Sequence, residues 1–133
     1  MPESAPPPGS ALRVLVVEDD PDVLQTTLEM LKLLGHWATG VGSAETARDR
    51  YLDGAFDVVM IDVGLPALSG LELAEALGVR DPVRIIFATG RPSPRELPAN
   101  TQWLRKPFGI DALADALATP ASGGMAPASP SPR

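Results

Sequence analysis

Short apolar runs alternate along the chain with longer segments in which apolar residues recur at helical spacing. The apolar runs occupy residues 13–17, 37–41, 57–62, 83–88 and 103–105. The run at 57–62 is apolar without interruption from Val58 to Ile61, as expected for a central strand buried on both faces. The alternation predicts repeated β-α-β units, and therefore an α/β fold with a doubly wound, five-stranded parallel sheet.

Local signals predict where the helices lie. Asp20 and Pro21 favour a helix start, and Gly35 favours its end. The face that this helix turns to the sheet is expected to be Val23, Leu24, Thr27, Leu28, Leu31 and Leu34. Further helices are predicted from about Ser43 to before Gly54 with Ala44, Ala47 and Tyr51 inward, over roughly 70–77, and around Ile110, Leu113 and Leu117.

One β-α unit departs from the pattern. Between the fourth and fifth predicted strands, Pro92, Pro94 and Pro98 leave no window for more than about one helical turn, because a proline inside a helix costs on the order of 3 kcal/mol. We therefore expect a loop in place of a fourth helix.

The two ends differ in composition from the middle. Residues 1–11 and 120–133 are rich in proline, serine and alanine, so we expect both to be disordered and place one folded domain at 12–119. The short segment after the last predicted helix leaves no room for an effector domain, so output is expected to occur through another protein.

Charge and composition narrow the possible functions. The 133 residues include 17 acidic and 11 basic side chains, scattered rather than clustered, which argues against nucleic acid as a partner. No apolar run approaches the roughly 20 residues needed to span a bilayer, and we expect no membrane association and a cytoplasmic location. There is no cysteine, so a bound ion must be held by oxygen ligands or by the lone His36, which favours a hard cation.

Polar residues follow four of the predicted strands. Glu18 and Asp19 come after the first strand, Asp62 closes the third, Thr89 follows the fourth, and Lys106 follows the fifth. Functional groups of an open parallel sheet gather at the carboxyl ends of its strands, so these side chains are expected to meet. Three carboxylates raise one another's pKa unless a cation neutralises them, and Mg²⁺ prefers such oxygen ligands together with phosphate oxygens.

The same set of residues suits phosphoryl transfer. Lys106 can neutralise charge on an incoming phosphoryl group and Thr89 can donate a hydrogen bond to it, which makes Asp62 the natural nucleophile. Each residue alone has an ordinary explanation: an acidic turn, a strand-end threonine, a surface lysine. The chemical interpretation depends on the fold that brings them together.

These residues resemble the receiver domains of bacterial response regulators over roughly 12–118. The resemblance rests on Val17-Glu18-Asp19-Asp20, on Asp62-Val63-Gly64-Leu65-Pro66-Ala67-Leu68-Ser69-Gly70, on Ala88-Thr89-Gly90 and on Lys106-Pro107-Phe108. The expected strand order is 2-1-3-4-5, as in flavodoxin-like folds. The short path from Thr89 to Lys106, together with Phe87-Ala88-Thr89-Gly90, is similar to the FAT GUY subclass, in which a mobile loop replaces the fourth helix.

The resemblance implies a role for each site residue. Asp62 would be the phosphoacceptor, while Glu18, Asp19, Asp62 and the backbone carbonyl of Gly64 would help to hold Mg²⁺. Thr89 and Lys106 would contact the phosphoryl group, Thr89 and Trp103 would form the switch, and Pro107 would follow a cis peptide bond. The donor would be a histidine kinase or a histidine phosphotransfer protein.

Two other classes of function remain open at this stage. A receiver-like module could bind its partner regardless of phosphorylation, and a flavodoxin-like domain could bind a flavin or nucleotide. We expect no enzyme with turnover of a separate substrate, because the domain would catalyse only its own phosphoryl acceptance. No Walker or dinucleotide fingerprint is present to favour nucleotide binding.

Overall fold

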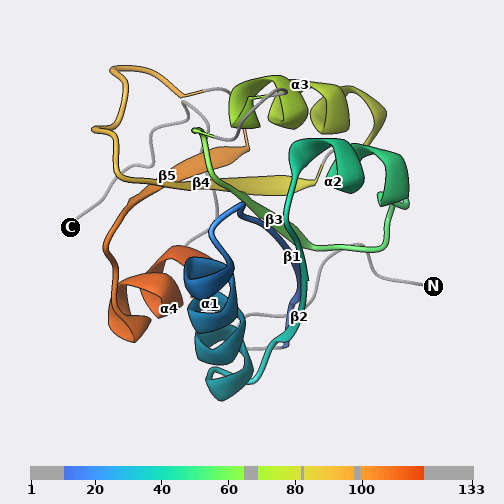
Figure 1. Ribbon diagram of the computed structural model, residues 1–133. Coiled ribbons are helices and arrows are strands. Elements are labelled where there is room, and N and C mark those ends of the chain that lie inside the picture. The colour runs from blue at the N-terminus through green and yellow to red at the C-terminus, as the bar shows by residue number, and fades with distance from the viewer. Residues whose placement is uncertain (1–10, 65–68, 82, 98–99, 119–133) are drawn as a thin grey trace.

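The structure is a computed structural model that describes residues 11–64, 69–81, 83–97 and 100–118 (Figure 1). The strands are β1 Arg13–Val17, β2 Trp37–Val41, β3 Val58–Ile61, β4 Arg84–Thr89 and β5 Thr101–Arg105. The helices are α1 Pro21–Leu33, α2 Ala44–Arg50, α3 Gly70–Arg80 and α4 Ile110–Ala118. The predicted disordered ends lie outside the described residues, apart from Ala11.

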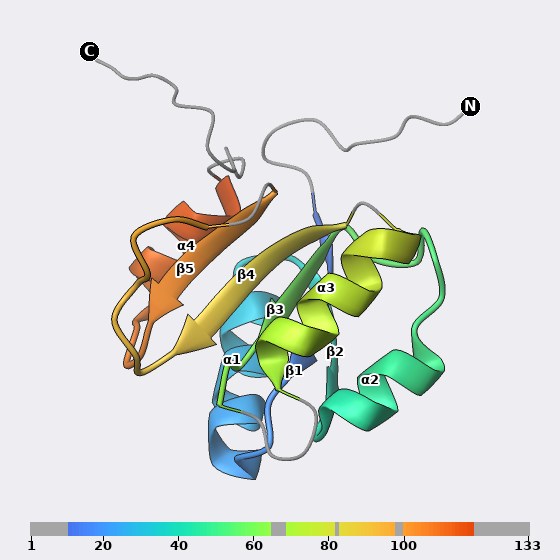
Figure 2. The same cartoon turned by 90° about the horizontal axis from the view of Figure 1, so that it is seen from above.

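The five strands form one parallel sheet in the order β2-β1-β3-β4-β5, which confirms the predicted fold class. Helices α1 and α4 cover one face, while α2 and α3 cover the other (Figure 2). Each face has its own apolar cluster, and β3 contributes to both because its side chains alternate between the faces. Val58 and Met60 pack toward α1 and α4, and Val59 and Ile61 pack toward α2 and α3.

Capping fixes the start of α1 beside the carboxyl end of β1. The Asp20 carboxylate accepts hydrogen bonds from the backbone N–H groups of Asp22 at 2.9 Å and Val23 at 3.3 Å. Such a cap contributes about 1 kcal/mol to helix stability. Gly35, with φ at +90°, lies just beyond the helix end in the left-handed region that glycine adopts without strain. Asp20 therefore has a structural role next to the acidic site.

Helix α3 begins close to the end of β3. The Ser69 hydroxyl accepts a hydrogen bond from the Glu72 N–H at 3.1 Å, and the Glu72 carboxylate accepts one from the Ser69 N–H at 3.0 Å. Gly70 lies within this capping box, as the first residue of the helix. A Cβ at Gly70 would overlap the backbone carbonyl of Asp62, so only glycine lets the helix approach the strand this closely.

The connection between β4 and β5 contains no helix in its described residues, 90–97 and 100. This confirms the loop that its prolines predict; membership of the FAT GUY subclass stays a prediction. Several element ends differ from expectation by a few residues. Helix α2 ends at Arg50, where Tyr51 takes extended backbone but still points inward, and α3 continues beyond the predicted end to Arg80.

Candidate functional site

Three carboxylates meet at the carboxyl edge of the sheet. Glu18 and Asp19 follow β1, and Asp62 follows the neighbouring strand β3. One oxygen from each side chain lies within 4.8 Å of the others. Glu18 is buried, Asp62 is half-buried and Asp19 is exposed, so the cluster opens to solvent on one side.

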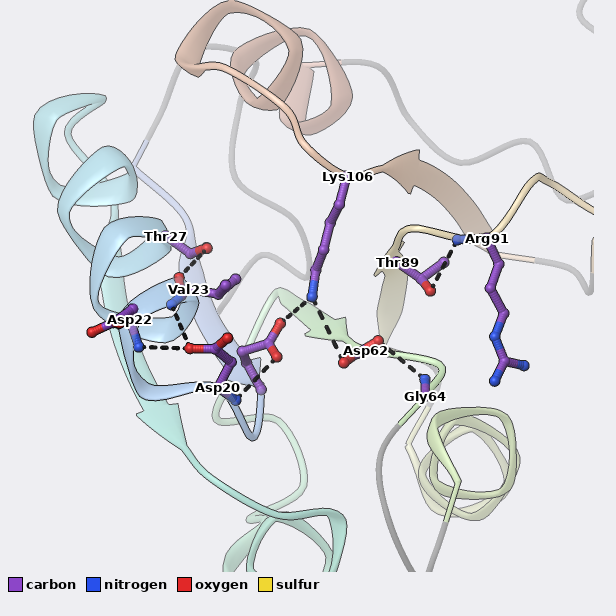
Figure 3. Close-up of polar contacts among 10 residues, drawn as sticks. Asp20, Asp22, Val23, Thr27, Asp62, Gly64, Thr89, Arg91 and Lys106 are labelled. Carbon is purple, nitrogen blue, oxygen red and sulfur yellow. Dashed lines mark hydrogen bonds and ion pairs between the residues drawn. The ribbon is translucent and has the colours of Figure 1, made fainter.

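Lys106 bridges the two inner carboxylates (Figure 3). Its Nζ donates to Glu18 Oε1 at 2.5 Å and lies 3.7 Å from Asp62 Oδ2. The lysine follows β5, and its backbone N–H donates to the carbonyl oxygen of Thr89 at 2.8 Å. The Lys106–Pro107 peptide bond is cis. The ammonium group therefore lies beside Asp62, as the sequence predicts, although its closest contact is Glu18.

The two oxygens of Asp62 have different surroundings. Oδ1 accepts a hydrogen bond from the backbone N–H of Gly64 at 3.0 Å, and Oδ2 faces Lys106 (Figure 3). A Cβ built at Gly64 would lie 3.8 Å from Asp62 Oδ1 and 3.9 Å from Arg91 Nη2. Because Gly64 has no side chain, the solvent side of Asp62 stays open toward Arg91.

Burial raises the pKa of the Glu18 carboxyl above its ordinary value. The hydrogen bond from Lys106 and one from the Asp20 N–H at 3.2 Å oppose that rise. The charged form of Glu18 therefore depends on these two hydrogen bonds. Glu18 thus relies on the neighbouring ammonium group of Lys106.

Thr89 and Trp103 are linked through the loop that follows β4. Thr89 is buried, and its Oγ1 accepts a hydrogen bond from the Arg91 N–H at 3.4 Å. The Trp103 Nε1–H donates to the Arg91 carbonyl oxygen at 2.9 Å, and its ring packs on Phe87 with centroids 5.7 Å apart. Trp103 is half-buried, and Arg105 Nε adds a hydrogen bond to the carbonyl oxygen of Gly90 at 3.3 Å. Side chains of β5 therefore hold two successive carbonyl groups of this loop.

A groove beside Lys106 is a feature that the sequence analysis missed. It has a volume of about 430 Å³ and lies between α1, from Asp22 to Met30, and the segment after β5. Its lining includes Val23, Thr26, Met30, Pro107 and Phe108. The signal that could have found it is the helical spacing of Val23, Thr26 and Met30, which continues beside the face that packs on the sheet.

Comparison with known proteins identifies the family. The family model of the response regulator receiver domain matches residues 14–118. The chain therefore belongs to the response regulator receiver domain family. As a member of that family, it has a phosphoacceptor role in two-component signal transduction.

Three curated relatives illustrate the range of proteins that carry such a domain. The response regulator receiver protein CpdR of Brucella abortus is 28% identical over 74% of this chain and 87% of its own length. The gliding motility regulatory protein of Myxococcus xanthus is 28% identical over 87% of this chain, and the virulence sensor protein BvgS of Bordetella bronchiseptica is 30% identical over 95%. The chain spans only 16% of the length of the Myxococcus protein and 11% of the length of BvgS.

Solved structures show the same fold. Response regulator protein TrrA of Thermotoga maritima, in complex with Mg²⁺ and BeF, superimposes with a TM-score of 0.69 at 25% identity, over 79% of this chain and 95% of that one. Vibrio cholerae chemotaxis protein CheY4 shares the fold, with a TM-score of 0.67 at 23% identity, over 81% of this chain and 97% of that one.

The chemistry of the carboxylate cluster fits the ion that receiver domains bind. Receiver domains bind Mg²⁺ at an acidic pocket, and Glu18, Asp19 and Asp62 form a group of hard oxygen ligands at the corresponding sheet edge. In the described part of the chain, no helix is both long and apolar enough to cross a membrane. The cytoplasmic location and the lack of nucleic-acid binding stay predictions.

Proposed function

We propose that Asp62 is the phosphoacceptor of this receiver domain. The observation that carries the proposal is the pair of contacts on its carboxylate, an N–H from Gly64 on one oxygen and the Lys106 ammonium 3.7 Å from the other. Asp62 is also the central strand's contribution to the acidic cluster, and its solvent side is open. A phosphoryl donor can therefore reach an oriented carboxylate.

The transfer exchanges one bond for another. A carboxylate oxygen of Asp62 attacks the phosphorus of a phosphohistidine on the donor protein, and the phosphorus–nitrogen bond breaks as the phosphorus–oxygen bond forms. The electron pair of the broken bond returns to the donor imidazole. Lys106 neutralises the charge that spreads over the phosphoryl oxygens, and this positioning is most of what such a transfer requires.

Glu18, Asp19, Asp62 and the backbone carbonyl of Gly64 would hold Mg²⁺. The bound ion would supply positive charge next to the carboxylates and the phosphoryl oxygens. In the structure, Lys106 donates its shortest hydrogen bond to Glu18. We expect a divalent ion to take over part of the neutralisation of Glu18, which leaves Lys106 free to turn toward the phosphoryl group on Asp62.

Thr89 and Trp103 would carry the response. The Thr89 hydroxyl donates a hydrogen bond to the phosphoryl group. The hydrogen bonds that Thr89 and Trp103 make to the backbone of Arg91 then transmit the movement of Thr89 to the indole on β5. The equilibrium between two conformations shifts only if phosphorylation favours one of them, and the Thr89 hydrogen bond is the contact that differs.

The phosphodonor is a histidine kinase or a histidine phosphotransfer protein. Support comes from the groove between α1 and Phe108, which opens beside Lys106, has a volume of about 430 Å³ and is lined in part by apolar side chains that suit a partner helix. Output occurs by protein–protein interaction, with no turnover of a separate substrate. The loop in place of a fourth helix, as in the FAT GUY subclass, gives that output surface a different shape.

The test is phosphorylation by acetyl phosphate with Mg²⁺, followed by intact-mass measurement. We expect the mass to rise by one phosphoryl group in the wild-type chain and in Asp111→Asn, a control on the exposed side of α4. Asp62→Asn should show no adduct. Modification of Asp62→Asn to the wild-type extent would refute the acceptor role, and an unmodified wild-type chain would favour a phosphorylation-independent interaction module.

A further inference from the structure

The free edge of β2 is uncharged and carries an exposed tryptophan. β2 is one of the two edge strands of the sheet (Figure 2). Trp37 is 73% exposed, and Leu33, at the end of α1, is 79% exposed. Edge strands of natural proteins commonly carry a charge or a proline that blocks pairing with another strand, and β2 has neither.

Hydrogen bonds to β1 show which backbone groups of β2 face outward. The Trp37 N–H donates to the Leu12 carbonyl oxygen at 2.8 Å, and the Val41 carbonyl oxygen accepts from the Glu18 N–H at 3.1 Å. Because successive residues of a strand direct their peptide groups to opposite sides, those of Ala38 and Gly40 point away from β1. Within the described residues, these outward groups have no backbone partner.

We infer that β2 is the docking surface for β2 of a second copy of this chain, paired antiparallel about a two-fold axis at Thr39. Ala38 would then face Gly40 of the partner subunit, which allows about four backbone hydrogen bonds across the axis. Trp37 would lie opposite Val41 of the partner subunit on the same face of the joined sheets. Cross-strand pairs of an aromatic and a β-branched residue are favourable.

Charge does not oppose a second copy at this edge. The chain has a net charge of -6, so two copies repel each other wherever their carboxylates meet. Residues 36–42 contain no acidic side chain. Arg13, the register neighbour of Trp37 on β1, is already neutralised by Asp57 at 2.9 Å. The edge is therefore a neutral strip whose outward hydrogen-bonding groups complement themselves under two-fold rotation.

The length of the strand sets the expected strength. β2 has 5 residues, so the interface falls below the roughly 1,000 Å² of a stable complex, and the dimer forms reversibly at high concentration. Sedimentation velocity of the full chain between about 10 µM and 1 mM measures this directly. The wild-type chain should move from the monomer toward the dimer mass across that range.

Two variants test the edge itself. Ala38→Pro removes an outward N–H without breaking a hydrogen bond to β1, a position where proline is tolerated, and Trp37→Lys adds the charge that edge strands commonly carry. Both should stay monomeric, while Leu52→Lys, a control at another residue that is 69% exposed, should dimerise like the wild type. A wild-type chain that is monomeric throughout, or a Trp37→Lys variant that dimerises as well as the wild type, would overturn the inference.

Discussion

At the scale of single residues, the site depends on one buried carboxylate and the cation that neutralises it. Glu18 is 5% exposed, and Lys106 is its charged partner, 88 residues away in the sequence. Breaking a buried ion pair from one side leaves an uncompensated charge, which is costlier than losing the pair itself. Lys106 thus stabilises the resting site and is also the group that we expect to serve the phosphoryl group.

Replacing Lys106 should slow the phosphorylation of Asp62. Lys106→Met removes the ammonium but keeps an apolar stem, and we expect phosphorylation of Asp62 by acetyl phosphate to slow by about 100-fold, as for the loss of one preorganised charge-stabilising donor. The rate of adduct formation by mass spectrometry measures the effect. Lys32→Met, which changes an exposed lysine of α1, is the matched control and should react at the wild-type rate.

His36 should make stability depend on pH near neutrality. Burial lowers the pKa of His36 from its ordinary value of 6.5, and its Nδ1 accepts a hydrogen bond from the Leu12 N–H at 2.9 Å. Because the folded-state pKa is depressed, the neutral form contributes stability that is present above the unfolded-state pKa. That stability is lost as the pH falls through the folded-state pKa.

Urea unfolding of the wild-type chain and of His36→Gln checks this behaviour. Between about pH 7.5 and 5.5, the wild type should lose more stability than the variant, because only the wild type has the imidazole to protonate. Equal losses in both proteins would show that His36 does not contribute.

At the scale of helices and strands, the start of α3 packs directly against the backbone of Asp62 at the end of β3. The capping box at Ser69 starts the helix, and Gly70 lets its first turn contact the backbone of Asp62. The same helix contains Gly78, where a Cβ would meet nothing within 4 Å. Alanine at these two glycines is therefore expected to change the stability in opposite directions.

Alanine should destabilise at Gly70 and stabilise at Gly78. At Gly70, the new Cβ overlaps the Asp62 carbonyl and Ile61, and we expect a loss of about 1–3 kcal/mol in the free energy of unfolding. At Gly78, alanine should add up to about 1 kcal/mol, because it favours the helix and restricts the unfolded chain. Urea denaturation measures both, and a Gly70→Ala variant as stable as the wild type would contradict the close approach.

The indole of Trp103 should hold the loop after β4. Trp103→Phe keeps a ring against Phe87 but removes the donor to the Arg91 carbonyl oxygen. We expect faster amide hydrogen exchange at residues 90–92 and a stability loss of about 1 kcal/mol or less, since the hydrogen bond is exposed. Unchanged exchange in this segment would mean that the indole does not restrain it.

The pattern of apolar residues was sufficient to predict the order of elements, but not all of their ends. β1 and α4 agree with the runs that predicted them because apolar residues fill each of their inward positions. The extension of α3 beyond residue 77 could not be predicted, because exposed Gly78 breaks the apolar spacing. The start of β5 at Thr101 was missed because a polar residue there is buried by its pairing with β4.

At the scale of the whole molecule, the topology of the sheet brings distant residues together. Neighbouring parallel strands end at one edge, so Glu18, Asp62 and Lys106 meet although they are far apart in the sequence. Sequence reasoning could predict this convergence from strand order alone. It could not predict that Lys106 lies closer to Glu18 than to Asp62, or that Arg91 links Thr89 with Trp103, because these depend on side-chain conformations.

The most direct test of the central claim is a pair of amide NMR spectra of the ¹⁵N-labelled chain, without and with Mg²⁺ and beryllofluoride. If Asp62 accepts the phosphoryl group at a metal site formed by the strand ends, shifts should concentrate at residues 18–20, 62–64, 89–91 and 103–106. The same additions to Asp62→Asn should give only the smaller changes due to Mg²⁺. Spectra that do not change, or that change equally in Asp62→Asn, would contradict the account.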